Sequence, residues 1–309
     1  MTKEQSSVRG ADFRAGFVSI TGLPNVGKST LLNALLGTRL SITSPKPQTT
    51  RNNIKGILNA PGSQTVFVDT PGMLSPRNLF EKSMSGAIQR AASEDSDLAL
   101  LLAEPRPPQP DKLAFFDQLK SVRAPLFLVI NKMDLYSGDP AGAEKTAGFF
   151  SERLSVNRIF YVSALGGKGV KELRKAILDS MPEHPPYYPV DQITDRWERF
   201  YAAEIIREQI FNLFTDEIPY ESAVEIEAFR ETEGMPDYVL AAVHVARRTQ
   251  KPILIGKAGR QIRILREKAQ DALAGFLGRP VKLELQVKVS PDWQNDPGFL
   301  RNIGLRDGK

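Results

Sequence analysis

The sequence contains no cysteine among its 309 residues, and only two histidines and two tryptophans. The lack of cysteine excludes disulfide bonds and any metal site or nucleophile that needs a thiolate. No stretch approaches the roughly 18 apolar residues of a membrane-spanning helix, and we expect the polar residues 1–12 to be neither a signal peptide nor a membrane span. The 41% hydrophobic and 25% charged residues are typical of a soluble globular protein. The net charge of +5 is a mild indication of a polyanionic partner.

A glycine-rich segment, GLPNVGKST at residues 22–30, joins a predicted strand to a predicted helix. This order of strand, loop and helix is the context in which the pattern G-x-x-x-x-G-K-[ST] forms a phosphate-binding loop. Gly22 and Gly27 allow backbone N–H groups to turn inward, and the helix directs its positive end at the same point. Lys28 is expected to reach the β- and γ-phosphates, and the hydroxyl of Ser29 to bind Mg²⁺. The segment therefore predicts a nucleotide site.

Three later motifs also follow predicted strands, at the edge where parallel sheets bind ligands. Asp69 can hold Mg²⁺ through water, and Gly72 allows its backbone N–H to approach a γ-phosphate. The carboxylate of Asp134 can accept both N–H groups on one edge of guanine. Adenine has no such pair, so a buried, unpaired Asp134 would reject it by several kcal/mol. The backbone of residues 163–165 stands after a further strand, where it can contact the base oxygen.

Short β-rich runs alternate with helical patterns from residue 15 to about 182, which predicts an α/β domain with a mostly parallel sheet. The expected strands are residues 17–22, 54–58, 65–69, 98–103, 126–131 and 158–163. We expect residues 1–14 to form a flexible tail and 15–182 to form this domain. Four prolines within residues 182–189 indicate a stiff linker, placed at 183–193, before a second domain at 194–309.

The four motifs, in this order and each at the end of a strand, resemble the P-loop GTPases over residues 15–182. The resemblance implies hydrolysis of GTP to GDP and phosphate, with catalytic roles for Lys28, Thr50 and Gly72. The GTP ligands that it implies are Asn25, Val26, Gly27, Lys28, Ser29, Thr30, Asp69, Gly72, Asn131, Lys132, Asp134, Ser163, Ala164 and Leu165.

Residues 41–51, rich in hydroxyls and proline, are expected to form the first switch loop of this GTPase. In GTPases a threonine of this loop binds Mg²⁺ and is ordered only while the γ-phosphate is present. The resemblance therefore implies that Mg²⁺ is held by Ser29, Thr50 and Asp69, with Thr49 as the alternative to Thr50. The second switch is expected at residues 71–80.

Two positions add expectations about turnover. Met73 stands where Ras-type proteins carry glutamine, and a methionine cannot orient a water molecule, so we expect slow intrinsic hydrolysis. Asn25 has two open interpretations. It is either a ligand for a K⁺ ion that stimulates hydrolysis, as in some relatives, or an amide that stabilises the loop.

The second domain has the predicted order helix, strand, strand, helix, strand. The first helix is expected to start at Thr194, and the strands are expected at 223–229, 238–245 and 281–289. Gly256-Lys257-Ala258-Gly259 opens the second helix after an apolar run. This order resembles a type II KH domain, a small α+β fold whose Gly-x-x-Gly loop clamps single-stranded nucleic acid. His244 is expected to face outward from its strand and, alone, supports no metal site.

Charge in the second domain is strongly segregated. Residues 239–268 carry eight basic side chains and one acidic, whereas residues 204–237 carry ten acidic and two basic. A basic edge around the Gly-x-x-Gly loop would follow the phosphates of a nucleic acid. The RNA-binding residues that we expect are Lys251, Ile255, Gly256, Lys257, Ala258, Gly259, Arg260 and Arg263.

The linker sequence YYPVDQITDR, the helix segment AEIIRE at 203–208 and the residues 250–259 together resemble the Era family of bacterial GTPases over residues 15–306. The resemblance implies single-stranded RNA binding near the 3′ end of 16S rRNA and a role in assembly of the 30S ribosomal subunit. It also implies a cytoplasmic location with loose contact to the inner face of the membrane, and we expect a monomer. Two alternatives stay open, an RNA-binding module whose nucleotide site only stabilises the fold and a membrane-associated signalling GTPase.

Overall fold

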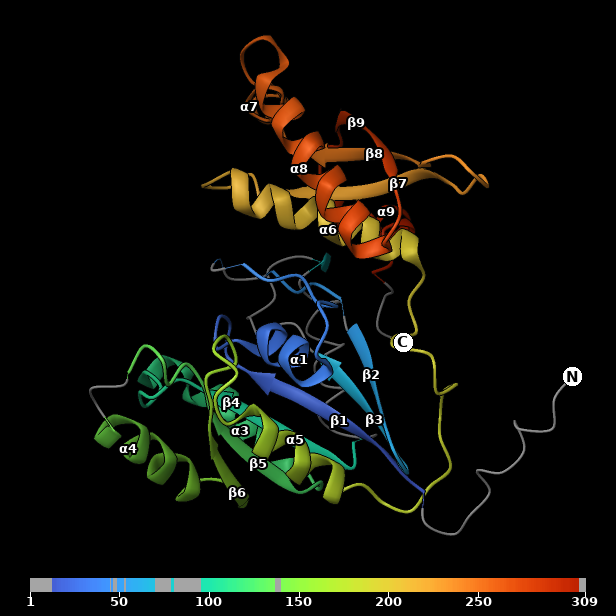
Figure 1. Cartoon of the computed structure of the whole chain (residues 1–309). Coiled ribbons are helices and arrows are strands. Elements are labelled where there is room, and N and C mark those ends of the chain that lie inside the picture. Colours follow the sequence, from blue (N-terminus) through green and yellow to red (C-terminus); the bar gives the residue numbers. More distant parts are fainter. Residues whose placement is uncertain are drawn as a thin grey trace, which may run out of the picture. The chain divides into compact units, whose positions relative to one another are not determined.

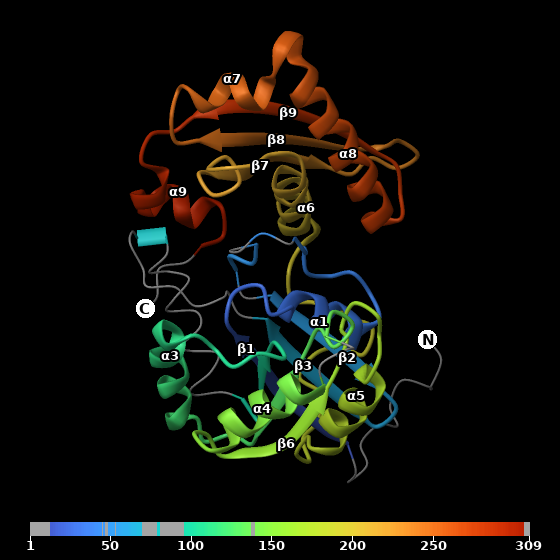
Figure 2. The same cartoon turned by 90° about the vertical axis from the view of Figure 1, so that its left-hand side faces the viewer.

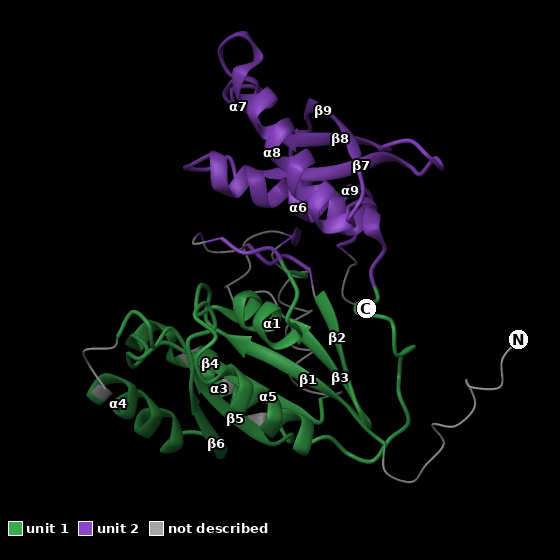
Figure 3. Ribbon diagram, viewed as in Figure 1, with its two compact units in different colours: residues 1–41, 53–73, 88–195 green, residues 42–52, 74–87, 196–309 purple. Residues whose placement is uncertain are grey.

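The computed structural model describes residues 13–44, 46, 49–52, 54–69, 79–80, 96–136 and 140–305. These residues form two compact units, coloured separately in Figure 3. The first unit draws on residues 1–41, 53–73 and 88–195, and the second on residues 42–52, 74–87 and 196–309. The described residues of 42–52 thus belong to the second unit, although they lie between strands of the first in sequence.

The first unit is built on a six-stranded sheet with the order β2-β3-β1-β4-β5-β6. Strand β2 runs antiparallel to its neighbour β3, and the other pairs of this sheet are parallel. The mostly parallel sheet predicted from the sequence is therefore confirmed. The strands are β1 (Arg14–Gly22), β2 (Ile54–Ala60), β3 (Ser63–Asp69), β4 (Leu98–Ala103), β5 (Leu126–Ile130) and β6 (Val156–Tyr161).

Helices cover both faces of this sheet, with α1 and α5 on one side and α3 and α4 on the other (Figures 1 and 2). Phe116 of α3 and Phe150 of α4 pack with Leu101 and Leu128 of the sheet in one buried cluster. The central strand β4 is buried along its whole length, as a parallel strand covered on both faces should be. The helices are α1 (Lys28–Leu36), α3 (Leu113–Gln118), α4 (Pro140–Ser151) and α5 (Val170–Asp179).

The start of the helix that follows the linker differs from the prediction. We expected it at Thr194, but α6 runs from Glu198 to Leu213 and has Trp197 as its N-cap residue. Thr194 instead forms an antiparallel bridge with Gly56 of β2, and the N–H of Ile57 donates to the carbonyl oxygen of Ile193 at 2.9 Å. The linker satisfies backbone groups of an edge strand, which the local sequence pattern did not reveal.

The second unit has a three-stranded sheet with the order β7-β8-β9, in which β7 and β8 are antiparallel and β8 and β9 parallel. Helices α6 and α8 pack on one face through apolar residues that include Ile206 and Leu265. This is the small α+β fold predicted for a type II KH domain. The remaining elements are β7 (Ser222–Arg230), β8 (Asp237–Val245), α7 (Gln250–Ile255), α8 (Arg260–Leu277), β9 (Val281–Val289) and α9 (Pro297–Asn302). In the described part of the chain, no helix combines the length and apolarity needed to cross a bilayer.

The prediction that His244 faces outward is wrong. The residue is only 5% exposed, and its ring lies against that of Phe299 in α9. Its Nδ1 is 2.8 Å from Ser290 Oγ and its Nε2 is 3.1 Å from Glu225 Oε2. The C-terminal helix covers this end of the sheet, so that a position expected to be solvated is enclosed.

Candidate functional site

The loop between β1 and α1 has a backbone conformation that its glycines permit. Gly22 and Gly27 have φ angles of +149° and +96°. A Cβ atom on Gly22 would lie 2.5 Å from the carbonyl oxygen of Leu102, and one on Gly27 would lie 2.3 Å from Nδ2 of Asn131. Both distances are too short for a side chain, so the loop packs closely only with glycine at these positions. Since α1 begins at Lys28, its N-terminus faces the loop.

The ammonium group of Lys28 is buried inside this loop. Its Nζ donates to the carbonyl oxygens of Gly22 and Leu23 at 3.0 and 2.9 Å. Burial lowers the pKa of Lys28 to about 8, and the charge of Asp69 partly offsets that effect. An anionic phosphate beside the ammonium would favour its charged form, so the position suits the polyphosphate of a nucleotide.

Asp69, at the end of β3, lies against Ser29 at the start of α1. Ser29 Oγ donates to Asp69 Oδ2 at 2.7 Å, whereas Asp69 Oδ1 is buried with no hydrogen-bond partner among the described residues. Burial raises the pKa of Asp69 to about 6, against the hydrogen bond from Ser29 and the charge of Lys28. A carboxylate oxygen that lacks a partner beside a hydroxyl fits Mg²⁺, which takes oxygen ligands and pairs one or two carboxylates with substrate phosphates. The structure thus brings two predicted metal ligands together.

Asn131 joins the phosphate loop to the loop that follows β6. Its Nδ2 donates to the carbonyl oxygen of Val26 at 2.8 Å, and its Oδ1 accepts from the N–H of Ala164 at 2.9 Å. Both side-chain groups of this buried amide are therefore used by the protein itself. Asn131 fixes the spacing between two segments that were both predicted to contact the nucleotide.

Asp134 and Lys132, both predicted to bind the base, lie in the turn after β5. Asp134 is exposed and accepts a hydrogen bond from the hydroxyl of Ser163. Lys132 has a φ angle of +64°, and its Nζ forms an ion pair of 2.6 Å with Glu104 after β4. The ends of β4, β5 and β6 therefore supply one constellation, in which Glu104 after β4 is a partner that the sequence did not predict.

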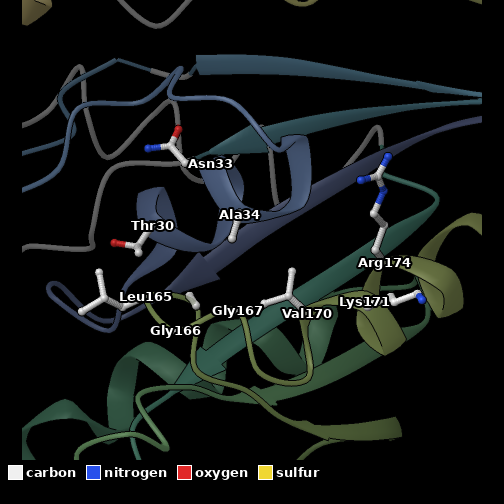
Figure 4. A pocket seen from close by; sticks show the side chains of 10 residues that line it. Thr30, Asn33, Ala34, Leu165, Gly166, Gly167, Val170, Lys171 and Arg174 are labelled. Atoms are coloured by element: carbon white, nitrogen blue, oxygen red, sulfur yellow. The ribbon is translucent and has the colours of Figure 1, made fainter.

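A cavity of about 610 Å³ adjoins this constellation. Figure 4 shows it between α1, the loop after β6 and α5, with Thr30 on one side and Lys171 and Arg174 on the other. Thr30, Ala164 and Leu165 are all predicted nucleotide residues, so the cavity is continuous with the predicted site. The full lining is Thr30, Asn33, Ala34, Ala164, Leu165, Gly166, Gly167, Val170, Lys171 and Arg174.

From residue 42 on, the described residues of the predicted first switch belong to another unit than the phosphate loop. Thr50 is buried in the second unit, within residues 42–52, and Thr49 Oγ1 donates to the carbonyl oxygen of Lys46 at 2.8 Å. Gly72 and Met73 lie outside the described residues, as do all of residues 70–78. The structure thus groups the phosphate, metal and guanine residues of the first unit, and it describes Thr50 as part of the other.

Arg51, which sequence reasoning missed, anchors the segment 42–52 in the second unit. Its guanidinium donates to the carbonyl oxygens of Ser222 and Pro219, both at 2.8 Å, and lies 5.0 Å from the ring centroid of Phe80. Burial lowers the pKa of Arg51 to about 9, the charge of Arg207 lowers it further, and Glu204 opposes both. No local signal marks this role, because the partners lie far away in sequence.

Two further contacts hold the same segment. The backbone N–H of Thr43 donates to Glu208 Oε1 of α6 at 2.9 Å. The Nζ of Lys46 donates to the carbonyl oxygens of Phe211 and Phe214, at the C-terminal end of α6. A cation at the end of a helix is favourable because the helix dipole is negative there. The segment that contains the predicted Mg²⁺ ligand Thr50 is therefore fixed at three points to the unit with the KH fold.

The predicted RNA loop forms a tight turn between α7 and α8. Gly256, Ala258 and Gly259 all have positive φ angles, of 73°, 52° and 74°. A Cβ on Gly256 would lie 2.9 Å from the backbone nitrogen of Gln261, whereas one on Gly259 would meet no described atom within 4 Å. The first glycine is thus required by the protein's own packing, and the second leaves open space in front of the loop.

Cationic side chains surround this open space. Lys257 lies within the turn, and Arg260 and Arg263 lie on the first turn of α8; all three are exposed. Lys251 and Ile255 of α7 are partly buried. An exposed turn flanked by cations has the geometry and the charge to follow a phosphate backbone.

These observations define the chain as a P-loop GTPase that carries a C-terminal KH domain. Residues 17–132 match the family described as 50S ribosome-binding GTPase, and residues 217–294 match the KH domain family. The chain is 42% identical over 295 residues to GTPase Era of Elusimicrobium minutum, and the matched region covers 95% of this chain and 98% of that protein. It is 44% identical over 294 residues to GTPase Era of Geobacter metallireducens, covering 94% and 98%. The chain therefore belongs to the Era family of GTPases.

Two solved structures of Era agree with this assignment. One is a single-residue variant of Aquifex aeolicus Era bound to GDP and AlF4⁻, which is 36% identical, has a TM-score of 0.89 and covers 95% of this chain and 100% of that one. The other is Era in complex with MgGDPNP and nucleotides 1506–1542 of 16S ribosomal RNA, with the same identity and TM-score and a coverage of 95% and 99%.

Proposed function

We propose that the chain is a GTP-binding and GTP-hydrolysing switch that binds single-stranded RNA near the 3′ end of 16S rRNA and acts in assembly of the 30S subunit. The observation that carries the proposal is the exposed turn Gly256–Gly259, with its open space and its surrounding cations, on the same chain as the phosphate, metal and guanine residues grouped in the first unit. The complex of a relative with a 16S rRNA segment and MgGDPNP supports both halves.

In the nucleotide half, Lys28 would stabilise the charge that develops on the transferred phosphoryl group. Asp134 would accept the two N–H groups of guanine, and Asn131 would keep the base loop and the phosphate loop at the required spacing. Ser29, Thr50 and, through water, Asp69 would hold Mg²⁺, which would neutralise charge at the phosphates. Gly72 would contribute a backbone N–H, and with Met73 beside it intrinsic hydrolysis would be slow.

In the RNA half, Gly256 and Gly259 would let the strand approach the backbone of the turn, while Lys257, Arg260 and Arg263 contact phosphates. Lys251, Ile255 and Ala258 would complete the binding edge. The affinity should fall steeply with salt, because each neutralised phosphate releases counterions.

The link between the halves would be the segment 42–52. Thr43, Lys46 and Arg51 fix it to the second unit, and Thr50 is the residue that would have to reach Mg²⁺ when GTP binds. Recruitment of Thr50 would alter these three attachments, so RNA affinity should depend on the nucleotide.

We propose a monomeric protein of the cytoplasm, with peripheral contact to the inner face of the membrane.

The test is a titration of the full chain with an oligonucleotide from the 3′ end of 16S rRNA, in the presence of a GTP analogue, GDP or no nucleotide, at two salt concentrations. A variant with Gly256→Asp and Gly259→Asp is the matched control for the turn, and its GTP affinity should be unchanged. Tight binding that requires the GTP analogue and both glycines is the expected result. If RNA affinity is the same with the GTP analogue, with GDP and without nucleotide, the chain is not a nucleotide-dependent switch. If neither protein binds the oligonucleotide, the result favours a signalling GTPase.

The role of Asn25 is tested separately. We propose that K⁺ stimulates GTP hydrolysis more than Na⁺ does, because Asn25 sits in the phosphate loop with a φ angle of +65° and can offer an amide oxygen to a monovalent cation. Equal hydrolysis rates in the two salts would contradict this role and leave Asn25 as an amide that stabilises the loop.

A further inference from the structure

Asn33, on the last turns of α1, holds the backbone of Ser41 at both of its polar groups. The Oδ1 of Asn33 accepts from the N–H of Ser41 at 2.8 Å, and its Nδ2 donates to the carbonyl oxygen of Ser41 at 2.8 Å. The same Oδ1 also accepts from the N–H of Leu40 at 2.9 Å. One amide therefore uses three hydrogen bonds to fix the end of the loop that follows α1.

The side chain of Ser41 points from this fixed position to the carboxylate of Asp69. Its Oγ donates to Asp69 Oδ2 at 3.3 Å, and Ser41 is completely buried. Ser29 donates to the same oxygen at 2.7 Å. Oδ2 is thus held by two hydroxyls, one from the phosphate loop and one from the loop after α1, while Oδ1 has no partner in the part of the chain that the structure describes.

This arrangement leaves one carboxylate oxygen for the metal and fixes the other. A carboxylate that holds Mg²⁺ must keep its orientation, since Mg²⁺ demands near-ideal octahedral geometry. Loss of a group that orients a metal ligand from behind typically lowers metal affinity by about 10- to 100-fold. Ser41 is in the position of such a group, and Asn33 is in the position of the group that fixes Ser41.

We propose that Asn33 and Ser41 are positioning residues for the Mg²⁺ site, acting through Asp69. The inference rests on the proposed role of Asp69 in holding Mg²⁺. Neither residue touches the metal in this mechanism. Ser41 keeps Asp69 turned so that Oδ1 faces the site, and Asn33 keeps Ser41 within reach of Asp69.

A second consequence follows from the position of Ser41 in the chain. The next residue, Ile42, begins the segment that belongs to the second unit. The brace formed by Asn33 and Ser41 therefore fixes the residue that directly precedes this segment. A rigid start point would limit the positions that Thr50 can reach.

The test is a titration with Mg²⁺ of a fluorescent GTP analogue bound to the full chain, for the natural sequence and for Ser41→Ala and Asn33→Ala. The half-saturating Mg²⁺ concentration should rise about tenfold in each variant, while the affinity of Ser41→Ala for GDP in the presence of a chelator should stay unchanged. Ser19→Ala is the matched control, because Ser19 is a fully buried serine on the neighbouring strand β1 whose hydroxyl has no hydrogen-bond partner among the described residues. Its Mg²⁺ dependence should equal that of the natural sequence.

The double variant distinguishes a mechanism in which Asn33 acts through Ser41 from one in which the two residues affect Mg²⁺ binding independently. If Asn33 acts through Ser41, adding Asn33→Ala to Ser41→Ala should raise the half-saturating Mg²⁺ concentration no further. The inference is wrong if Ser41→Ala and Ser19→Ala depend on Mg²⁺ in the same way. If Asn33→Ala does not fold, the comparison of these two serine variants still decides the case. If Mg²⁺ has no effect on binding of the GTP analogue by the natural sequence, the proposed metal site itself is wrong.

Discussion

The guanidinium of Arg51 donates to the carbonyl oxygen of Ser222 at 2.8 Å, across 171 residues of sequence. Arg51 directly follows the predicted Mg²⁺ ligand Thr50, whereas Ser222 opens the first strand of the KH sheet. One hydrogen bond thus ties the residue next to the proposed switch residue to the backbone of the KH fold. Both residues belong to the second unit, so a displacement of Thr50 would act directly on the first strand of the KH sheet.

Arg51→Ala should lower the free energy of unfolding of the second unit by about 3 kcal/mol, because buried carbonyl oxygens of Ser222 and Pro219 lose a charged donor. Urea denaturation followed by tryptophan fluorescence measures this change. The natural reporter is Trp293, which is 1% exposed, and Trp197→Phe removes the other tryptophan, which is 85% exposed. The exposed Arg248→Ala is the control and should shift stability by less than about 0.5 kcal/mol. Equal midpoints for the two variants would show that Arg51 is not an anchor.

Asp134→Asn should lower the affinity for GTP about 100-fold, because the base edge then meets one donor and one acceptor in place of two acceptor oxygens. Xanthine offers a carbonyl oxygen where guanine has its amino group, so the same variant should gain affinity for xanthosine triphosphate. Competition of GTP, ATP and xanthosine triphosphate against a fluorescent nucleotide checks both changes. Asp179→Asn, an exposed change on α5, should leave the order of affinities intact. A preference for GTP that survives in Asp134→Asn would contradict the assigned role.

Gly27→Ala should weaken GTP binding at least about tenfold, since the new Cβ would lie 2.3 Å from the Asn131 amide and break its bond to the phosphate loop. Gly37→Ala is the paired control: Gly37 also has a positive φ, of 71°, but a Cβ there would meet no described atom within 4 Å. It should cost about 1 kcal/mol of stability through backbone strain and leave GTP affinity unchanged. Calorimetric titration with GTP and thermal denaturation together distinguish the two effects. The same loss of affinity in both variants would mean that strain alone explains the result.

His244 should make the second unit less stable in mild acid. Burial lowers the pKa of His244 below the ordinary histidine value, Lys288 adds to that effect, and Glu225 and Glu227 partly offset it. A lowered pKa in the folded state means that the stabilising contribution is complete above the unfolded pKa of about 6.5 and is lost as the pH falls through the folded value. The chain has only two histidines, so NMR titration with His184→Gln as the assignment variant reads the pKa of His244 directly. A pKa at or above the ordinary value would contradict the prediction, and His244→Gln should remove this part of the acid sensitivity.

Much of the nucleotide site was predictable because its parts are local. Gly22, Lys28 and Ser29 lie close together in the sequence, between the end of β1 and the start of α1, and their spacing alone defines the phosphate loop. Asp69 and Asp134 each end an apolar run, and since parallel strands end at one edge of a sheet, strand order was enough to predict that they share a site. The Gly-x-x-Gly turn and the segregated charge were likewise visible without coordinates.

The tertiary structure alone decided the contacts that join distant segments. Ser41 reaches Asp69 across 28 residues and Arg51 reaches Ser222 across 171, and no periodicity in either segment indicates such a partner. His244 is enclosed because α9 folds over its end of the sheet, and α6 starts late because Thr194 pairs with an edge strand. Sequence patterns report which residues suit a strand, a turn or a phosphate, since these preferences act over a few residues. Which buried carboxylate, carbonyl or ring a side chain finally meets depends on how the whole chain packs, and only the folded structure contains that information.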